Sequence, residues 1–562
     1  MFRIAKEHPG RVGLAALTAL VAFHYVWGLG GLPLLDWDEN MLAEASRQML
    51  ERGNFLRVYV NDYAYAEKPP FFFWAQALSF WLFGVGEFAA RLPSALAGLA
   101  TMLLVYRFGR WLHSARFGLL WATAYATALA PTLLGRFGLV DATFNMFITL
   151  SVGLLYRFDT AYGHWRQDPR LGRRGHWTWL VLASLAMGLG VLTKGPLGGA
   201  VPVFAFGVYK LFYRRPPVAP AHFLACAGIS LGLASSWYLI NAALYGIDFL
   251  MGFIRIQAAL FSRPLEGHAW PFFFHFIAVP ILLLPWTPVL FATRRGGLAA
   301  SPKIRQVGLL AVAWSAFVLT VMSLVSTKLP HYSSSVYVPF ALWVAVVLED
   351  RLAAGIALPR PVVAALAVLA LGFGAFVYFV PEVVRRAVVA QGFVYDPPWP
   401  PLLLPAALAV SAALLVGAVW FWRGRMVGGI CATAIGVVLF TQSFWIFHLP
   451  PVARLIQGPV VEMVRSLHDA GERVVFYRYV SFAALFYGRQ PITMLYTYKF
   501  PGDPSILDRR HEKDIYVLTR KRFRARLLAD HPLVEHVEDR GNFGLFRLPA
   551  RRGGEAARPV KP

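Results

Sequence analysis

The feature that most constrains this chain is a series of apolar runs, most of them 18 to 25 residues long. A helix of that length crosses a hydrocarbon core about 30 Å thick. Fourteen runs occur, at 12–31, 71–86, 91–112, 115–134, 139–156, 177–193, 197–213, 221–245, 271–293, 306–325, 331–349, 360–380, 400–422 and 427–448. Hydrophobic residues make up 57% of the 562 residues and charged residues 15%, whereas soluble domains carry about 25% charged residues. The pattern excludes a soluble multidomain protein and predicts a polytopic α-helical membrane protein.

The run 71–86 decides the sidedness of all the others. It has only 16 residues, carries Gln76 and Ser79, and is rich in Phe and Trp, which suits an interfacial helix. Thirteen spans then remain, and from a cytoplasmic N-terminus the basic clusters at 157–174 and 294–305 fall in cytoplasmic loops, as the positive-inside rule requires. Counting 71–86 as a span would place every such cluster outside. We therefore expect about 13 transmembrane helices, with the N-terminus in the cytoplasm.

The net charge of +24 follows from the same rule, so it requires no nucleic-acid partner. Cys226 and Cys431 both lie inside apolar runs, which excludes a disulfide framework and a cysteine-based metal site. The first apolar run is followed by no small-residue cleavage site, so we expect an uncleaved first span.

An odd number of spans places the C-terminal segment outside. Helix-like and strand-like stretches alternate there, at Val460–Ala470, Arg473–Val480, near Ala483, at Ile492–Tyr498, Ile515–Thr519 and Lys521–Ala529, before two closing strands. This alternation predicts a small α/β domain. The predicted organisation is a transmembrane domain over 1–449 whose first outer loop (32–90) carries interfacial helices, a periplasmic α/β domain over 450–550, and a disordered tail over 551–562.

The first outer loop holds two groups of charged residues. Asp36, Asp38 and Glu39 precede a helix whose Met41, Leu42, Ala45, Met49 and Leu50 form one apolar face, which we expect to lie on the membrane. A helix N-cap with an acidic first turn explains the acids without chemistry. The alternative is that Asp38 is a catalytic acid and that Asp36 and Glu39 bind the substrate. Glu67 and Lys68 precede two prolines, either as a local ion pair or as substrate ligands.

Further polar residues fall at the outer ends of spans. Asp141 is either an N-cap or a second functional acid, and Arg136 serves either an anionic lipid head or the anchoring of its span. Lys194 and Lys328 lie outside against the positive-inside trend. Snorkelling to the interface is one explanation, but we favour phosphate binding, for which an ammonium group is a compact ligand.

The outer loop 245–271 adds Arg255, Arg263 and His268. The arginines are candidates for contact with a phosphorylated lipid. His268 and a carboxylate such as Glu67 are ligand types that suit a divalent transition metal. One histidine and one carboxylate are too few to specify such a site, and a hydrogen-bonded interfacial histidine is the alternative.

Together these residues describe an outer cavity, at membrane level, that contains carboxylates and cations. Cations stabilise a departing phosphate, and a carboxylate steadies an oxocarbenium-like centre or accepts a proton from an acceptor hydroxyl. Sugar transfer from a lipid phosphate needs those parts, and no Gly-rich loop for a nucleotide sugar is found. A transporter or flippase of a lipid-linked sugar and a non-catalytic lipid-binding subunit remain as alternatives, although no internal repeat of the kind common in transporters is seen.

Six motifs resemble the bacterial lipid A aminoarabinose transferases, of the GT-C class that also contains protein O-mannosyltransferases. They are DWDEN (36–40), AEKPP (66–70), EFAARLPSA (87–95), GLVDATF (138–144), LTKGP (192–196) and TKLPHY (327–332). The resemblance implies a GT-C fold that transfers 4-amino-4-deoxy-L-arabinose from undecaprenyl phosphate to a lipid A phosphate, giving resistance to polymyxin and other cationic peptides.

The resemblance also assigns roles to individual residues. It implies that Asp38 and Asp141 are the catalytic acids, and that Glu67 and His268 can hold zinc. The residues it implies around the carrier phosphate or the acceptor are Glu67, Lys68, Lys194, Lys328, His331 and Tyr332. Two departures from the family pattern, Met41–Leu42 and the serine-rich stretch 331–337, leave the exact sugar and acceptor open between aminoarabinose on lipid A and another sugar, core oligosaccharide or protein.

Overall fold

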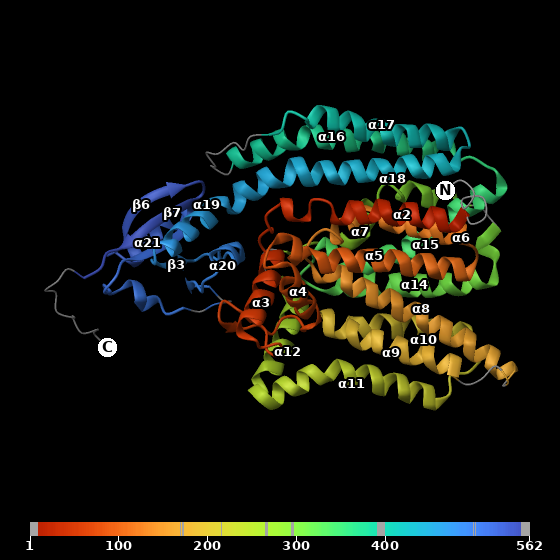
Figure 1. Ribbon diagram of the computed structural model, residues 1–562, viewed down its shortest axis with the longest axis horizontal. Helices are drawn as coiled ribbons and strands as arrows, with labels where there is room; N and C mark the ends of the chain where they lie inside the picture. Colours follow the sequence, from red (N-terminus) through yellow and green to blue (C-terminus); the bar gives the residue numbers. More distant parts are fainter. Residues whose placement is uncertain are drawn as a thin grey trace.

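The computed structural model describes residues 9–168, 170, 174–214, 216–264, 268–293, 297–390, 399–497, 500 and 502–551. It is an elongated molecule in which a bundle of long helices runs along the long axis and a smaller α/β region caps one end (Figure 1). The predicted disordered tail, 551–562, lies outside the described residues except for Arg551.

The bundle is built almost entirely from helices because backbone polar groups in lipid must be satisfied within the segment itself. The first helix is α2 (Pro9–Val26). It is followed by η1 (Leu29–Gly31), α5 (Glu87–Leu112), α6 (Ala115–Ala126), α7 (Leu129–Leu134), α8 (Val140–Gln167), α9 (Arg174–Lys194), α10 (Leu197–Phe212), α11 (Pro220–Tyr245), α12 (Asp248–Ser262), α13 (Phe274–Leu282), η3 (Thr287–Ala292), η4 (Gly297–Ala300), α14 (Pro302–Leu324), η5 (Pro330–Val336), α15 (Tyr337–Ala354), α16 (Arg360–Ala390), α17 (Leu403–Trp422) and α18 (Met426–Ser443).

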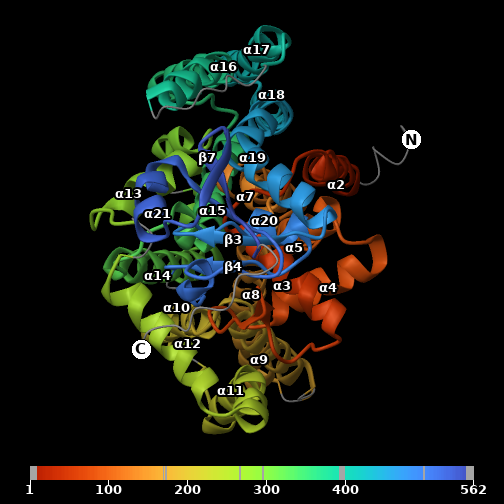
Figure 2. The ribbon, with the colours of Figure 1, turned by 90° about the vertical axis from the view of Figure 1, so that its left-hand side faces the viewer.

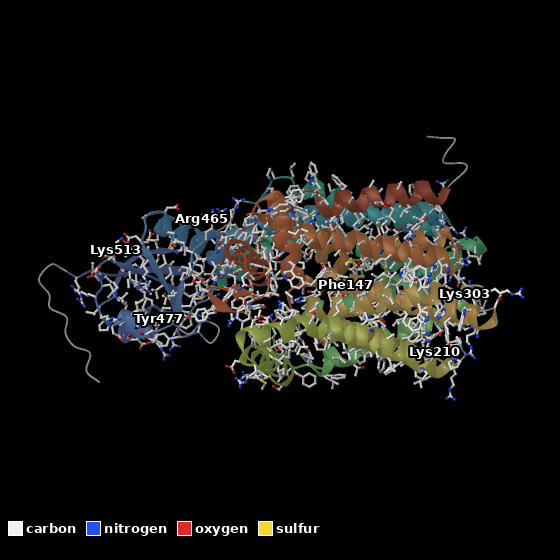
Figure 3. All side chains as sticks on the ribbon, turned by 60° about the horizontal axis from the view of Figure 1, so that its bottom comes forward. Phe147, Lys210, Lys303, Arg465, Tyr477 and Lys513 are labelled. Atoms are coloured by element: carbon white, nitrogen blue, oxygen red, sulfur yellow. The ribbon has the colours of Figure 1, made fainter. Side chains whose placement is uncertain are left out.

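Eight helices among the described residues are long and apolar enough to cross a membrane. The prediction of a polytopic helical membrane protein is confirmed, whereas the count of thirteen spans stays a prediction. Helix α4 (Phe71–Phe83), the run that we expected to be interfacial, has 13 residues and is therefore about 20 Å long, too short for a hydrocarbon core of about 30 Å. Basic residues of predicted cytoplasmic loops, Lys210 and Lys303, lie at the end of the bundle opposite to Arg465, Tyr477 and Lys513 (Figure 3).

Small residues let neighbouring helices approach closely at two hairpins. A Cβ atom on Gly118 of α6 would lie 2.4 Å from the carbonyl oxygen of Tyr106 on α5, and one on Gly198 of α10 would lie 2.2 Å from the carbonyl carbon of Gly190 on α9. Lipid provides no hydrophobic driving force between helices, so close packing of this kind drives their association in a membrane.

The C-terminal region contains a five-stranded sheet in the order β4-β3-β5-β7-β6. Its strands are β3 (Arg473–Tyr477), β4 (Thr493–Leu495), β5 (Ile515–Arg520), β6 (Glu535–Arg540) and β7 (Phe543–Leu548), accompanied by α20 (Phe482–Gly488), η7 (Pro504–Leu507), η8 (Lys521–Phe523) and α21 (Arg524–Asp530). Strands β3, β4 and β5 are parallel, while β7 is antiparallel to β5 and β6. Helices and strands follow one another in the predicted order. The status of the region as a separate periplasmic domain stays a prediction.

The last helix of the bundle does not stop at the predicted boundary at 449. Helix α18 passes through a π-helical turn, η6 (Phe444–His448), directly into α19 (Leu449–Asp469). The apolar stretch Met426–Asp469 is thus one unbroken helical rod of 44 residues, and it carries the chain from the bundle into the sheet region (Figure 1).

The first outer loop folds into α3 (Asp38–Arg52), a short hairpin of β1 (Tyr59–Val60) and β2 (Tyr63–Ala64), and α4. The predicted helix forms, but the prediction that its apolar face lies on the membrane was wrong. Met41, Leu42, Ala45 and Met49 are buried in one core cluster with residues of α4, α19 and α20. Viewed from the C-terminal side, α3 and α20 lie together near the middle of the molecule (Figure 2).

Candidate functional site

Two acids of the predicted site sit at the first residues of helices, and each faces a lysine. Asp38 begins α3 and Asp141 lies in the first turn of α8, positions where the helix dipole favours a negative charge. The Nζ atom of Lys68 lies 3.7 Å from Oδ1 of Asp38. Lys194, the last residue of α9, forms a direct ion pair with Asp141, whose side chain is almost wholly buried. Segments far apart in sequence thus supply two acid–lysine pairs.

The two pairs belong to one electrostatic cluster. Burial lowers the pKa of Lys68, but the carboxylates of Asp38, Glu67 and Asp141 together raise it above the usual value. Lys68 therefore stays charged, and it links the acid of α3 to the acid of α8. The structure brings Asp38, Glu67, Lys68, Asp141 and Lys194 together, as the topology predicted.

Two residues of η5, His331 and Tyr332, also lie next to the cluster. Nζ of Lys194 lies 5.3 Å from the ring centre of Tyr332 and 5.7 Å from that of Phe144, distances typical of cation–π contact. His331 interacts electrostatically with Asp141 and Asp38. Both residues of η5 that the sequence singled out therefore lie at the site.

Glu67 is held through its backbone and has a tyrosine for a neighbour. Nε2 of Gln257, on α12, donates to the carbonyl oxygen of Glu67 at 3.1 Å. Burial, followed by the charges of Glu67 and Asp38, raises the pKa of Tyr65 well above its usual value. Tyr65 therefore keeps its proton and is a hydrogen-bond donor beside two acids.

Three residues that we predicted to bind the substrate have partners within the protein. Asp36 accepts hydrogen bonds from the backbone amides of Phe482 and Ala483 at 3.1 Å and from Oγ of Ser481 at 2.9 Å. It therefore holds the N-terminus of α20 rather than of α3.

Glu39 and Arg136 are buried in the same region. Glu39 forms a bidentate ion pair with the fully buried Arg91, at 2.8 and 2.9 Å, and accepts the amide of Gly138 at 2.6 Å. Arg136 donates to the carbonyl oxygens of His24 and Trp27 and lies over the ring of Trp445. Burial first, and then the charge of Arg91, lowers the pKa of Arg136 to about 9. Contacts of Asp36, Glu39 and Arg136 with substrate stay predictions.

The remaining candidates lie at the edge of the cluster. Nζ of Lys328 donates to the carbonyl oxygen of Val325 at 2.6 Å, and its amide donates to the carbonyl of His268 at 3.1 Å. Arg255 and Arg263 are exposed, and the carbonyl of Arg263 accepts from Thr327 at 3.1 Å. The side chains of Arg255 and Arg263 are therefore open to a ligand, whereas that of Lys328 is buried.

The predicted zinc site finds no support in this geometry. No group of three or more His, Cys, Asp or Glu side chains among the described residues is placed to hold a metal ion. Protein zinc sites use three or four such ligands, so Glu67 and His268 alone do not fit one.

Several residues at the site were missed from the sequence. Ser334 Oγ lies 3.4 Å from Oδ1 of Asp141 and 3.3 Å from Oδ1 of Asn145. Asn145 is four residues after Asp141 on α8, a spacing that puts both on one helix face and is the signal that was available. Tyr65 and Phe144 carried no such signal, because aromatic residues are frequent throughout this chain.

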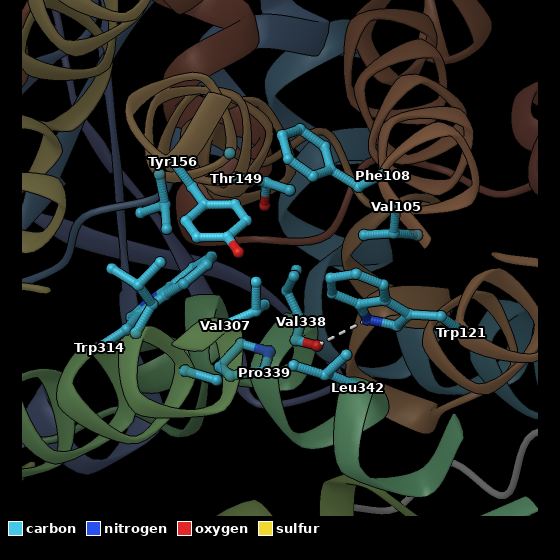
Figure 4. Close-up of a pocket in the computed structure, with 14 residues that line it drawn as sticks. Val105, Phe108, Trp121, Thr149, Tyr156, Val307, Trp314, Val338, Pro339 and Leu342 are labelled. Atoms are coloured by element: carbon cyan, nitrogen blue, oxygen red, sulfur yellow. Dashed lines mark hydrogen bonds between the residues drawn. The ribbon is translucent and has the colours of Figure 1, made fainter. Parts of the chain in front are cut away.

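A cavity deeper in the bundle is separate from the cluster. It measures about 40 Å³ and lies between α5, α6, α8, α14 and α15, where Trp121 donates to the carbonyl of Val338 at 3.0 Å (Figure 4). The hydroxyls of Thr149 and Tyr156, which line it, are bonded within the protein. A small apolar space with no free polar group in its lining does not suit a sugar or a phosphate.

The sequence is similar to known membrane glycosyltransferases. Residues 15–292 match the family model of dolichyl-phosphate-mannose-protein mannosyltransferase. An undecaprenyl phosphate-alpha-4-amino-4-deoxy-L-arabinose arabinosyl transferase from Edwardsiella ictaluri is 28% identical over 340 residues, 59% of each chain. The protein of that name from Erwinia tasmaniensis is 30% identical over 330 residues, 58% of this chain and 57% of its own. Over about three fifths of its length, the chain is similar to the aminoarabinose transferases. It spans about three fifths of the length of the curated relatives it matches.

The fold has a match over nearly its whole length. The crystal structure of ArnT from Cupriavidus metallidurans bound to undecaprenyl phosphate has a TM-score of 0.75 at 19% identity, covering 96% of this chain and 99% of that one. The apo structure of the same protein gives a TM-score of 0.76. The GT-C architecture expected from the motifs is therefore confirmed at the level of the fold.

Proposed function

We propose that this relative of the aminoarabinose transferases is itself a glycosyltransferase. It moves 4-amino-4-deoxy-L-arabinose from undecaprenyl phosphate to a phosphate of lipid A at the periplasmic face of the inner membrane. The product carries less negative charge, which lowers the attraction of polymyxin and other cationic peptides for the cell surface. The names of the curated relatives support the choice of sugar and donor.

The observation that carries the proposal is the pairing of Asp38 with Lys68 and of Asp141 with Lys194 in one cluster. The reaction breaks the bond between the anomeric carbon and the carrier phosphate oxygen and forms a bond from that carbon to an acceptor phosphate oxygen. Undecaprenyl phosphate leaves with the electron pair, and the two lysines stabilise its charge. An acceptor phosphate is already a competent nucleophile, so Asp38 and Asp141 orient it and stabilise positive charge at the anomeric carbon.

The membrane arrangement is part of the same proposal. Thirteen spans, a cytoplasmic N-terminus and a periplasmic region beyond residue 450 place the cluster outside the cytoplasm, where a lipid-linked donor replaces a nucleotide sugar. The distribution of Lys and Arg over the predicted loops supports this orientation.

A second candidate keeps the fold and donor class but changes the sugar or the acceptor. The family model that matches residues 15–292 describes protein mannosyltransferases, which favours a hydroxyl of a protein as the alternative acceptor. Such an acceptor must lose a proton during transfer, so Asp38 or Asp141 would then act as a general base.

The test is product analysis with the purified full chain. The protein is incubated with undecaprenyl-phosphate aminoarabinose, or with other polyprenyl-phosphate sugars, and with lipid A or an acceptor protein, and the products are weighed by mass spectrometry. We expect lipid A to gain the mass of one aminoarabinose residue, and we expect Asp38→Asn and Asp141→Asn to abolish the gain. Movement of the donor lipid across proteoliposomes without any product would instead identify a transporter.

A further inference from the structure

The segment η5 carries three consecutive serines, Ser333, Ser334 and Ser335, and each reaches a different helix. Oγ of Ser333 lies 3.1 Å from Nδ1 of His275 on α13, and Nε1 of Trp314 on α14 donates to Oγ of Ser335 at 3.2 Å. Ser334 faces α8. All three side chains are almost wholly buried, at 0%, 3% and 3% exposure. The three serines are thus equally buried, but each has a different hydrogen-bond partner.

The contacts of Ser334 are unlike those of its neighbours. Its hydroxyl lies 3.4 Å from the carboxylate of Asp141 and 3.3 Å from the side-chain oxygen of Asn145. Both distances exceed the usual 2.5 to 3.0 Å of an O–H···O bond. A hydroxyl has one proton, so it can donate to only one of these two acceptors at a time.

Asp141 does not need that proton while Lys194 is paired with it. The direct ion pair already neutralises the buried carboxylate. The proposed function, however, requires Lys194 to bind the carrier phosphate, and a phosphate competes with Asp141 for the same ammonium group. A buried carboxylate that loses its partner is strongly destabilised unless another donor replaces it.

We propose that Ser334 is a positioning residue that replaces Lys194 on Asp141 when the donor phosphate binds. The hydroxyl turns from Asn145 to the carboxylate as the ammonium group moves to the phosphate. Asn145 and Asp141 thus act as two alternative acceptors, one used in the free enzyme and the other in the donor complex. The inference rests on the proposed function, because the phosphate of the donor drives the exchange.

The serine triplet supplies its own matched controls. Binding of undecaprenyl phosphate to the full chain in detergent is measured for the wild type, Ser334→Ala and Ser335→Ala, together with the melting temperature of each ligand-free protein. A hydrogen bond to a charged group is worth enough that its loss weakens binding about tenfold or more. We expect that loss for Ser334→Ala only, whereas Ser335→Ala lowers the melting temperature and leaves the affinity unchanged.

A second pair of variants separates the hydroxyl from the shape of the side chain. Ser334→Thr and Ser334→Val add the same bulk, but only threonine keeps a donor. We expect Ser334→Thr to bind the lipid at least tenfold more tightly than Ser334→Val, even if both are less stable than the wild type.

A double variant tests the exchange itself. In a Lys194→Met protein, Ser334 already binds Asp141 without the donor. Removing its hydroxyl then destabilises the ligand-free protein and the donor complex by the same free energy. Ser334→Ala is then expected to leave the remaining affinity unchanged. Equal affinities for Ser334→Ala and Ser335→Ala, or an undiminished Ser334 effect in the Lys194→Met background, would overturn the inference but not the proposed function. A wild-type chain that fails to bind undecaprenyl phosphate would overturn both.

Discussion

The buried ion pair of Glu39 and Arg91 gives the sharpest prediction about the frame of the site. Both carboxylate oxygens of Glu39 bind the guanidinium group, and they also accept the amides of Gly138 at 2.6 Å and Leu35 at 2.9 Å. Arg91 in turn donates to the carbonyls of the loop before α3. One carboxylate therefore ties together the first outer loop, α5 and the turn that leads to Asp141.

Glu39→Gln removes the charge with almost no change of shape. The amide nitrogen of glutamine is a donor, so it faces another donor at one of these positions, and the charge of Arg91 is left without a counter-ion at 0% exposure. Breaking a buried ion pair in this way costs about 3–5 kcal/mol. We expect a clear fall in melting temperature and rapid inactivation in detergent, together with a loss of activity that follows the loss of folded protein.

Glu382→Gln is the matched control, because it removes the same charge from an exposed ion pair with Arg385 and Arg386. Exposed pairs contribute little, so its melting temperature should equal that of the wild type. The reasoning is refuted if Glu39→Gln melts like the wild type while binding of the donor is lost. Glu39 would then contact the substrate, as predicted from the sequence.

Three further outcomes follow from the contacts described above. Asp36→Asn loses the charge-assisted bonds to Ser481 and the start of α20, worth about 1.5–3 kcal/mol each when fully formed, so hydrogen exchange of the 482–484 amides should accelerate. The pKa of Lys68 is raised above its usual value of 10.5, so this lysine keeps its charge throughout the range from pH 6 to 9. The pH profile of activity in that range should therefore have the same shape in Lys68→Arg as in the wild type and differ only in height. A cysteine in place of Asp62 should react with a membrane-impermeant maleimide added to intact spheroplasts, whereas one in place of Lys303 should react only after lysis; the reverse pattern would invert the proposed topology.

The acid–lysine cluster could be predicted from the sequence because the predicted topology singles out the few charged residues at the outer ends of the spans. Lys194 was recognisable as a lysine at the outer end of a span, against the general trend, and the same topology placed Asp38 and Asp141 beside it. The roles of Asp36 and Glu39 were not recoverable in this way. Asp36 binds amides 446 and 447 residues further along the chain, and no local pattern encodes a partner at that distance.

The helix continues past the predicted end of the last span for a local physical reason. Pro450 and Pro451 would interrupt a helix interior, because proline cannot donate the backbone hydrogen bond that is needed there. In the structure they lie in the first turn of α19, directly after the π-helical turn Phe444–His448, where wider i→i−5 bonding replaces the regular pattern. The composition of the stretch did not reveal this accommodation.

The unbroken helical rod from Met426 to Asp469 sets the distance between the helical bundle and the sheet. At 1.5 Å per residue its 44 residues measure about 66 Å, roughly twice the thickness of the hydrocarbon core. One residue inserted beyond His448 would turn everything after it by about 100° and carry α20 away from Asp36. The length of this segment is therefore constrained by the contacts that its far end makes with the first outer loop, such as those of Gln457 with Leu34 and Asp36.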